Sequence, residues 1–152
     1  MAKSVLAGSI IILLIAIFLG IFISGLPPQA EYKFPGATEA VKQYFESWGK
    51  KDWPNMYSVI SDGFKKIEPT AKTLAGFKVY AESQNMSAVK ILGLKEESND
   101  GKTAIIGYSA EFTLSDGSKK EFSDKFTLKF READVIKGWK LIHPYGENID
   151  TS

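Results

Sequence analysis

A run of 22 uncharged residues, Val5 to Leu26, limits the possible folds of this chain more than any other feature of its sequence. As an α-helix the run would measure about 33 Å, which is enough to cross a bilayer hydrocarbon core of about 30 Å. Pro27 and Pro28 follow it, and proline ends a helix because it lacks an amide hydrogen and clashes with the preceding turn. We therefore predict a transmembrane helix over residues 5–26, preceded by a short tail, residues 1–4.

A cleaved signal peptide is the alternative for this segment. The apolar part of a signal peptide usually has about 7–15 residues, and small residues follow at the cleavage site. The run here is longer, and cleavage after Ala30 would put Pro28 at a position that favours a small residue. We therefore expect the chain to keep the segment as a signal anchor.

The flanks and the small residues of this segment predict its orientation and packing. Lys3 precedes it and the sequence after it is nearly neutral, so the positive-inside rule places the tail in the cytoplasm and the rest of the chain outside. We expect a single-pass protein of the cell membrane. Ala16, Gly20 and Ser24 recur every four residues, a spacing that lets two helices approach closely. Small residues are also common in membrane helices generally, so both interpretations stand.

Composition excludes several kinds of site. The chain has no cysteine, which rules out disulfides, thiolate nucleophiles and cysteine-based zinc sites. One histidine makes a histidine-based metal site improbable, and we predict neither a metal nor a cofactor. After residue 30 the basic and acidic residues balance, 18 against 18, so the chain lacks the basic surface that binds nucleic acid.

Three helices are predicted after a linker over residues 27–36. The first helix has an apolar face at helical spacing and ends at Gly49. The second begins at an Asp52 cap, with Pro54 in its first turn. The third begins at Thr73 or Thr70. Their apolar positions are, in order, Val41, Tyr44, Phe45 and Trp48; Trp53, Met56, Tyr57 and Ile60; and Leu74, Phe77, Tyr80 and Ala81. Each set repeats at a spacing of three or four residues, which puts it on one side of a helix.

The hydrophobic period then changes from that of a helix to that of a strand. The even positions from Ala104 to Leu114 are apolar and the odd ones are more polar, and the same alternation runs from Lys119 to Arg131. Turn sequences separate the predicted strands, which cover residues 89–95, 102–114, 119–131 and 138–143. Helices followed by a run of strands indicate an α+β domain, residues 37–146, with three helices on a curved antiparallel sheet of about four strands. Residues 147–152 form a C-terminal tail.

The extramembrane sequence resembles the nuclear-transport-factor-2-like superfamily, whose cone-shaped α+β fold is also called cystatin-like. The resemblance covers residues 37–144 and rests on AVKQYFESW at 40–48, KDW at 51–53, SDGF at 61–64 and GWKLI at 138–142. The resemblance suits the small extracytoplasmic members, which are tethered by one membrane helix or a lipid. The resemblance implies that any ligand or catalytic group would lie inside the cone; it does not imply an activity.

Asp124 is the most interesting candidate for a functional residue. By alternation it shares the inward face of its strand with Phe122 and Phe126, and an apolar cone would disfavour its charged form. Such a carboxyl group could act as a general base or could anchor a polar part of a ligand. We predict a ligand pocket lined by Tyr108, Phe112, Asp124 and Phe126. The alternatives are that a bulge turns the Asp124 side chain outward, or that Asp124 lies at the end of the sheet beyond the core. In either case Asp124 would not line a pocket.

Three further residues are candidates with ordinary alternatives. His143 could pair with Asp124, or it could be a histidine at a strand end before Pro144. Tyr108 could offer a hydroxyl to the same pocket, although buried tyrosines usually serve the core. Asn85 begins an Asn-Met-Ser glycosylation triplet, a pattern that also arises by chance.

These observations support three hypotheses of function. The first is a membrane-anchored, non-enzymatic interaction module, such as an accessory subunit that docks on a membrane protein or on itself. The second is a domain that binds a small ligand inside the cone. The third is an isomerase- or dehydratase-like enzyme with Asp124 as base and Tyr108 or His143 assisting.

Overall fold

The computed structural model of the protein describes residues 32–143. The chain divides into two units, Met1–Lys33 and Phe34–Ser152, and every helix and strand of the described residues belongs to the second. The membrane segment predicted at 5–26, with Ala16, Gly20 and Ser24, lies outside the described residues, as does the predicted tail at 147–152. Between residues 32 and 143, no helix combines the length and apolar character needed to cross a membrane.

Helix α2 (Ala37–Lys50) carries the apolar face that the sequence predicts, with Val41 and Phe45 buried. It continues past Gly49 and ends where Lys51 takes a left-handed conformation, with a φ of 57°. A Cβ at Gly49 would lie 3.3 Å from the carbonyl oxygen of Val89. Gly49 therefore allows close packing against a strand, and the prediction that it ends the helix was wrong by one residue.

The second predicted helix is present and short, and a further short helix that the sequence did not predict follows it. Helix α3 (Trp53–Ser58) begins at Asp52, whose side chain accepts a hydrogen bond from the Asn55 amide, as predicted. Helix α4 (Asp62–Ile67) begins at Ser61, and a 3-10 turn, η1 (Pro69–Ala71), follows. Helix α5 (Leu74–Ser83) begins at the predicted Thr73 cap. Because α4 has only six residues, its sequence shows too little periodicity to predict it.

The strands form one antiparallel sheet in the order β1-β2-β3-β4, which confirms the predicted α+β class and the four-stranded sheet. The strands are β1 (Met86–Asn99), β2 (Thr103–Leu114), β3 (Lys119–Arg131) and β4 (Gly138–Leu141). Strand β1 is twice the predicted length, because three shifts of register against β2 break its alternation. The β2–β3 register is regular, which is why alternation predicted both strands well.

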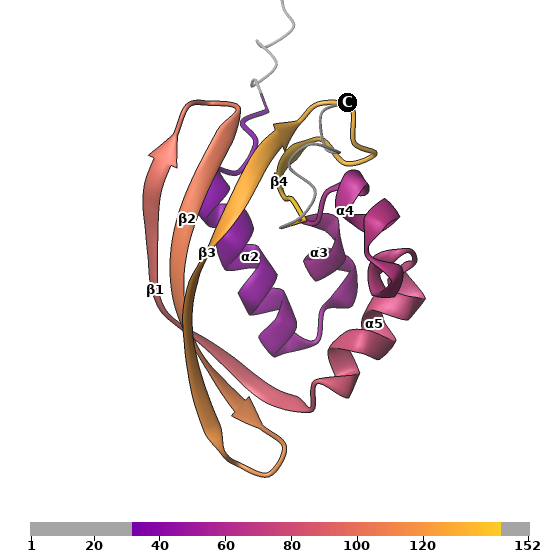
Figure 1. Ribbon diagram of the computed structural model, residues 1–152, viewed down its shortest axis with the longest axis vertical. Coiled ribbons are helices and arrows are strands. Elements are labelled where there is room, and N and C mark those ends of the chain that lie inside the picture. The colour runs from indigo at the N-terminus through magenta and orange to yellow at the C-terminus, as the bar shows by residue number, and fades with distance from the viewer. Residues whose placement is uncertain (1–31, 144–152) are drawn as a thin grey trace, which may run out of the picture. The chain divides into compact units, whose positions relative to one another are not determined.

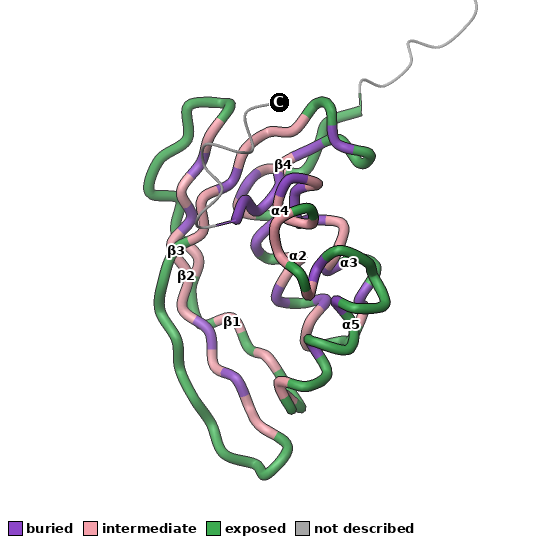
Figure 2. Tube along the Cα trace, turned by 45° about the vertical axis from the view of Figure 1, so that its right-hand side comes forward, coloured by how far each residue is buried: buried purple, intermediate pink, exposed green. Residues whose placement is uncertain are grey.

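Helix α2 lies across the inner face of the curved sheet, and α3, α4 and α5 follow on the same side (Figure 1). One buried cluster joins α2 to the sheet, with Phe45, Ile106 and Leu128 among its members. A second cluster, which includes Met56 and Phe77, joins α3 to α5. Burial along the trace is uneven, since the first half of β3 and most of β1 are exposed (Figure 2).

Candidate functional site

The residues of the predicted pocket lie on the inner face of the sheet but are not equally buried. Tyr108 and Phe126 stack with ring centroids 4.7 Å apart, and Phe112, which is buried, contacts Phe45. Asp124 is opposite Tyr108 in the β2–β3 register, but it is exposed. Residues 119–125 of β3 are all exposed, so Asp124 does not have the apolar surroundings predicted for it. The alternation correctly gave its face but could not show that this part of the face lies open.

A cavity of about 260 Å³ lies elsewhere on the inner face. Helices α2, α4 and α5, the turn η1, and strands β3 and β4 all contribute to its walls. Most of the lining is apolar and consists of Ile60, Phe64, Ala71, Phe77, Phe126, Leu141 and Ile142. Four polar residues complete it: Tyr44, Glu68, Thr70 and Tyr80. Of the predicted pocket residues, Phe126 is the one that lines this cavity.

Glu68 supplies a carboxylate to the cavity wall. It caps η1, because its Oε1 accepts hydrogen bonds from the Thr70 hydroxyl at 2.8 Å and the Thr70 amide at 3.2 Å. These two bonds lower the pKa of Glu68 below its usual value, so the side chain is ionised at neutral pH. Glu68 was not among the sequence candidates, although the sequence Glu68-Pro69-Thr70 is that of a capped turn.

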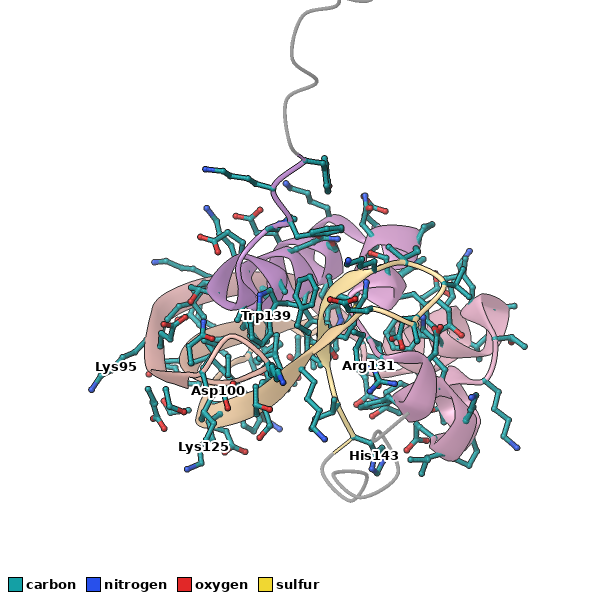
Figure 3. The ribbon with its side chains drawn as sticks, turned by 90° about the horizontal axis from the view of Figure 1, so that it is seen from above. Lys95, Asp100, Lys125, Arg131, Trp139 and His143 are labelled. Carbon is teal, nitrogen blue, oxygen red and sulfur yellow. The ribbon has the colours of Figure 1, made fainter. Side chains whose placement is uncertain are left out.

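His143 lies beside this carboxylate. Its Nε2 is 3.6 Å from the Oε2 of Glu68, and its ring packs edge-on against Phe64 with centroids 4.8 Å apart. It is 9% exposed, just past the end of β4 (Figure 3). The acidic neighbour predicted for His143 was Asp124, whereas the structure places Glu68 next to it.

Tyr44 brings a phenol group from α2 to the same cavity. Burial raises its pKa well above the usual value of a tyrosine, and the nearby Tyr80 and Tyr108 raise it further. The hydroxyl is therefore protonated at physiological pH and can donate a hydrogen bond. The cavity thus combines an apolar interior with neutral hydroxyl groups, that of Tyr44 among them, and one anionic acceptor, Glu68.

Tyr44 should make the stability of the domain depend on alkaline pH. Because its pKa is higher in the folded than in the unfolded chain, its contribution is complete below a pH of about 10, where unfolded tyrosine titrates, and is lost above it. We expect the free energy of unfolding to fall less steeply above pH 10 in Tyr44→Phe than in the wild type. Urea unfolding between pH 8 and pH 11 measures this. Lys140, whose pKa burial lowers, acts in the opposite direction but is present in both proteins.

Tyr32→Phe is the matched control, because Tyr32 is 72% exposed and precedes the domain. It should keep the wild-type pH profile. Equal slopes for the wild type and Tyr44→Phe would contradict the role assigned to Tyr44.

A second group of charged residues joins α4 to the connection between β3 and β4. Arg131 Nε lies 3.1 Å from Asp134 Oδ1, and Asp134 Oδ2 accepts a hydrogen bond from the Asp62 amide at 3.0 Å. Asp62 in turn accepts hydrogen bonds from the Val135 amide at 2.8 Å and from Lys65 Nζ at 3.0 Å. Burial by itself would raise the pKa of Asp62, but these two bonds, together with the charges of Lys65 and Lys140, lower it overall. The sequence gave no sign of this network, because its members come from distant segments.

Two remaining expectations concern metal binding and glycosylation. Across residues 32–143, no three acidic or histidine side chains gather as a metal site would require. Asn85 is exposed and has a left-handed conformation between α5 and β1, with a φ of 53°. Its backbone carbonyl accepts a hydrogen bond from the Ser115 amide.

Comparison with known proteins identifies the fold. The sequence matches no protein-family model and no curated protein. Among solved structures, it is similar to a SEC-C motif containing protein from Psychrobacter arcticus (9% identity, TM-score 0.53) over 77% of this chain and 64% of that one. It is also similar to Δ5-3-ketosteroid isomerase from a Mycobacterium species (11% identity, TM-score 0.50) over 69% of this chain and 90% of that one. The domain shares the fold of these two proteins.

A protein of unknown function from Shewanella oneidensis, described as NTF-2 like, also matches, with 10% identity and a TM-score of 0.49 over 69% of this chain and 94% of that one. The chain spans under two thirds of the Psychrobacter protein. At these identities the similarity to the Psychrobacter protein and the ketosteroid isomerase establishes a shared fold alone. What the domain does must be argued from its own cavity and surfaces.

Proposed function

We propose that the domain binds a small, mostly apolar molecule in the cavity lined by Tyr44 and Glu68, and that residues 5–26 anchor it at the outer face of the cell membrane. The observation that carries the ligand proposal is the cavity itself, about 260 Å³ with seven apolar and four polar lining residues. An apolar pocket with a few convergent polar groups is the usual form of a small-molecule site. This volume suits a molecule of one or two rings.

The polar groups define the part of the ligand that they recognise. Tyr44 can donate a hydrogen bond, whereas the Glu68 carboxylate can only accept one. A neutral molecule with a hydroxyl group can satisfy either residue. An anionic ligand is disfavoured, because it would be placed near the ionised Glu68. The proposed ligand is therefore a small phenol or alcohol with an apolar body.

Binding of 4-fluorophenol tests this proposal. We expect the full chain in lipid nanodiscs to bind it saturably by fluorine NMR, with empty nanodiscs as the baseline. Ala71→Leu should weaken binding about tenfold, equivalent to about 1.4 kcal/mol, because the added methyl groups occupy the cavity. Tyr44→Phe should weaken it less, by the roughly 0.5–1.5 kcal/mol of one hydrogen bond.

Ala75→Leu is the matched control, since Ala75 lies on the exposed side of α5. It should bind like the wild type. The proposal is wrong if the wild type shows no saturable binding, or if Ala71→Leu folds normally and binds equally well.

The anchor is supported by the uncharged run at residues 5–26 and by Lys3 before it. The expected result is that the protein resists extraction by alkaline carbonate and that protease removes the domain from intact cells. Release by carbonate would exclude the anchor, and a protected domain would reverse the orientation.

An interaction module is the second candidate, and strand β1 favours it. This strand is one edge of the sheet and is mostly exposed along its 14 residues. Sheet edges present backbone groups to which another strand can pair. A membrane protein partner or a second copy could add a strand there, and the mass of the native particle in mild detergent would reveal it. An isomerase or dehydratase using Asp124 has less support, because that carboxylate is exposed.

A further inference from the structure

The loop between β3 and β4 carries two adjacent apolar side chains that the domain does not cover. Val135 is 92% exposed and Ile136 is 54% exposed. Single apolar residues on a surface need no explanation. Here, however, two neighbours lie in one connection, and Lys137 follows them directly.

The backbone of this loop is held in place. The Val135 amide donates to Asp62 Oδ2 at 2.8 Å, and the preceding residue, Asp134, is 9% exposed and forms the ion pair with Arg131. Figure 3 looks onto this end of the domain and shows Arg131 beside the loop. The network fixes the backbone, and the two apolar side chains project from it into solvent. The network therefore holds Val135 and Ile136 in an exposed position.

The chain enters the domain beside this loop. The Phe34 ring packs edge-on against Phe130 at 5.5 Å, and Lys137 Nζ lies 5.3 Å from the centre of the Phe34 ring. A Cβ on Gly138 would lie 3.7 Å from the Phe34 ring. Figure 1 shows the segment before α2 and the β3–β4 loop at the same end of the domain.

The length of chain before Phe34 limits how far this end can lie from a membrane. The uncharged run ends at Leu26, and only residues 27–33 separate it from Phe34. At about 3.3–3.6 Å per residue, even a fully extended connection would reach less than about 30 Å. A bilayer crossed by residues 5–26 would therefore lie within about 30 Å of Phe34.

Nearby positive charges suit a phospholipid surface. Lys137 follows the apolar pair, and Lys66 lines the same surface hollow as Val135. Both are exposed. The ion pair of Lys137 with Glu132 is weak, because it is 3.8 Å long and largely in solvent, and the Lys137 ammonium also lies over the Phe34 and Phe130 rings. Lysines that flank apolar residues can bind headgroup phosphates while the apolar residues enter the boundary of the acyl chains.

We propose that the β3–β4 loop inserts Val135 and Ile136 into the headgroup boundary of the bilayer that the N-terminal segment spans. The bilayer is thus a second contact for the domain besides its anchor. It would fix which end of the domain faces the lipid. The inference rests on the proposed anchor, and the experiment separates the two.

The absence of cysteine allows single labels to be placed in the full chain. The variants are Val135→Cys, Ile136→Cys, Val79→Cys and Ile15→Cys, each carrying an environment-sensitive fluorophore. The proteins are reconstituted in vesicles of phosphatidylcholine and phosphatidylglycerol. The vesicles contain no nitroxide, nitroxides near the headgroups for the surface labels, or nitroxides deep on the acyl chains for the label at 15. Val79 is the matched control, because it is 68% exposed and lies on α5, away from the loop.

We expect the labels at 135 and 136 to emit at shorter wavelength in vesicles and to lose most of their emission to nitroxides near the headgroups. The label at 79 should lose little. If the label at 15 is quenched while those at 135 and 136 remain in water, the loop proposal is wrong and the anchor stands. If the emission of the loop labels moves to shorter wavelength but is not quenched, the loop contacts a protein, such as a second copy. That result also contradicts the loop proposal. If the label at 15 is not quenched either, the anchor itself fails.

Discussion

Phe45→Ala should lower the free energy of unfolding by about 3–5 kcal/mol, the usual cost of removing a large buried ring. Phe45 is 2% exposed and projects from α2 into the sheet. Its ring contacts those of Tyr108, Phe112 and Phe126, with centroid distances of 4.9, 6.2 and 5.9 Å. Because one side chain joins the helix to two strands, its loss leaves a cavity that neither element can close. Urea unfolding of the solubilised chain, followed by tryptophan fluorescence, measures the change.

Phe122→Ala is the control for this prediction. Phe122 also touches Phe112, at 5.6 Å, but it is 51% exposed. Its removal should cost much less, since little apolar area returns to water. Similar costs at the two positions would mean that α2 is not held on the sheet through Phe45.

Asp134→Ala should destabilise the domain by about 3 kcal/mol. The substitution removes the ion pair of Asp134 with Arg131, whose side chain is 10% exposed, and removes the acceptor of the Asp62 amide. Breaking one side of a buried ion pair is costly because the other charge stays buried. The same unfolding experiment measures the loss. Asp134→Asn should cost less, because an amide oxygen can still accept one of the two bonds.

Glu132→Ala, in the same loop, is the control. Its ion pair with Lys137 is 3.8 Å long and mostly in solvent, so its loss should change stability by less than about 1 kcal/mol. An Asp134→Ala protein as stable as Glu132→Ala would show that the network does not hold the loop. The proposal that the loop presents Val135 and Ile136 to a bilayer would then lose its structural basis.

Local sequence pattern predicted helix starts and strand bounds correctly where neighbouring residues alone decide the conformation. The Asp52 and Thr73 caps begin their helices as predicted, because a side-chain oxygen three residues before a free amide is a local arrangement. Strand β3 has the predicted bounds because its alternation is unbroken. The same reasoning was wrong at Gly49, whose role is to let Val89 approach from another element.

Local sequence pattern did not predict which residues of the candidate site are buried or which of them are neighbours. Alternation placed Asp124 on the inner face, but whether a residue of that face is buried depends on how far the helices extend over the sheet. Glu68 was overlooked because it occurs in a short turn with no periodicity. His143 was recognised as a candidate, yet its neighbour could not be inferred, since Glu68 reaches it only after α4 and β4 pack together.

The sequence by itself determined the α+β class, the four-stranded sheet and the helical face of α2, because each depends on a periodicity that the chain carries locally. It also predicts the membrane segment at residues 5–26, from an uncharged run of sufficient length. Only the tertiary structure decided where the cavity lies and which polar groups enter it. Tyr44 on α2 and Glu68 before η1 both line the cavity, and His143, which lies beside Glu68, follows β4. Val135 stays exposed while Asp134 beside it is buried. Such placements depend on packing between distant segments, which no local pattern encodes.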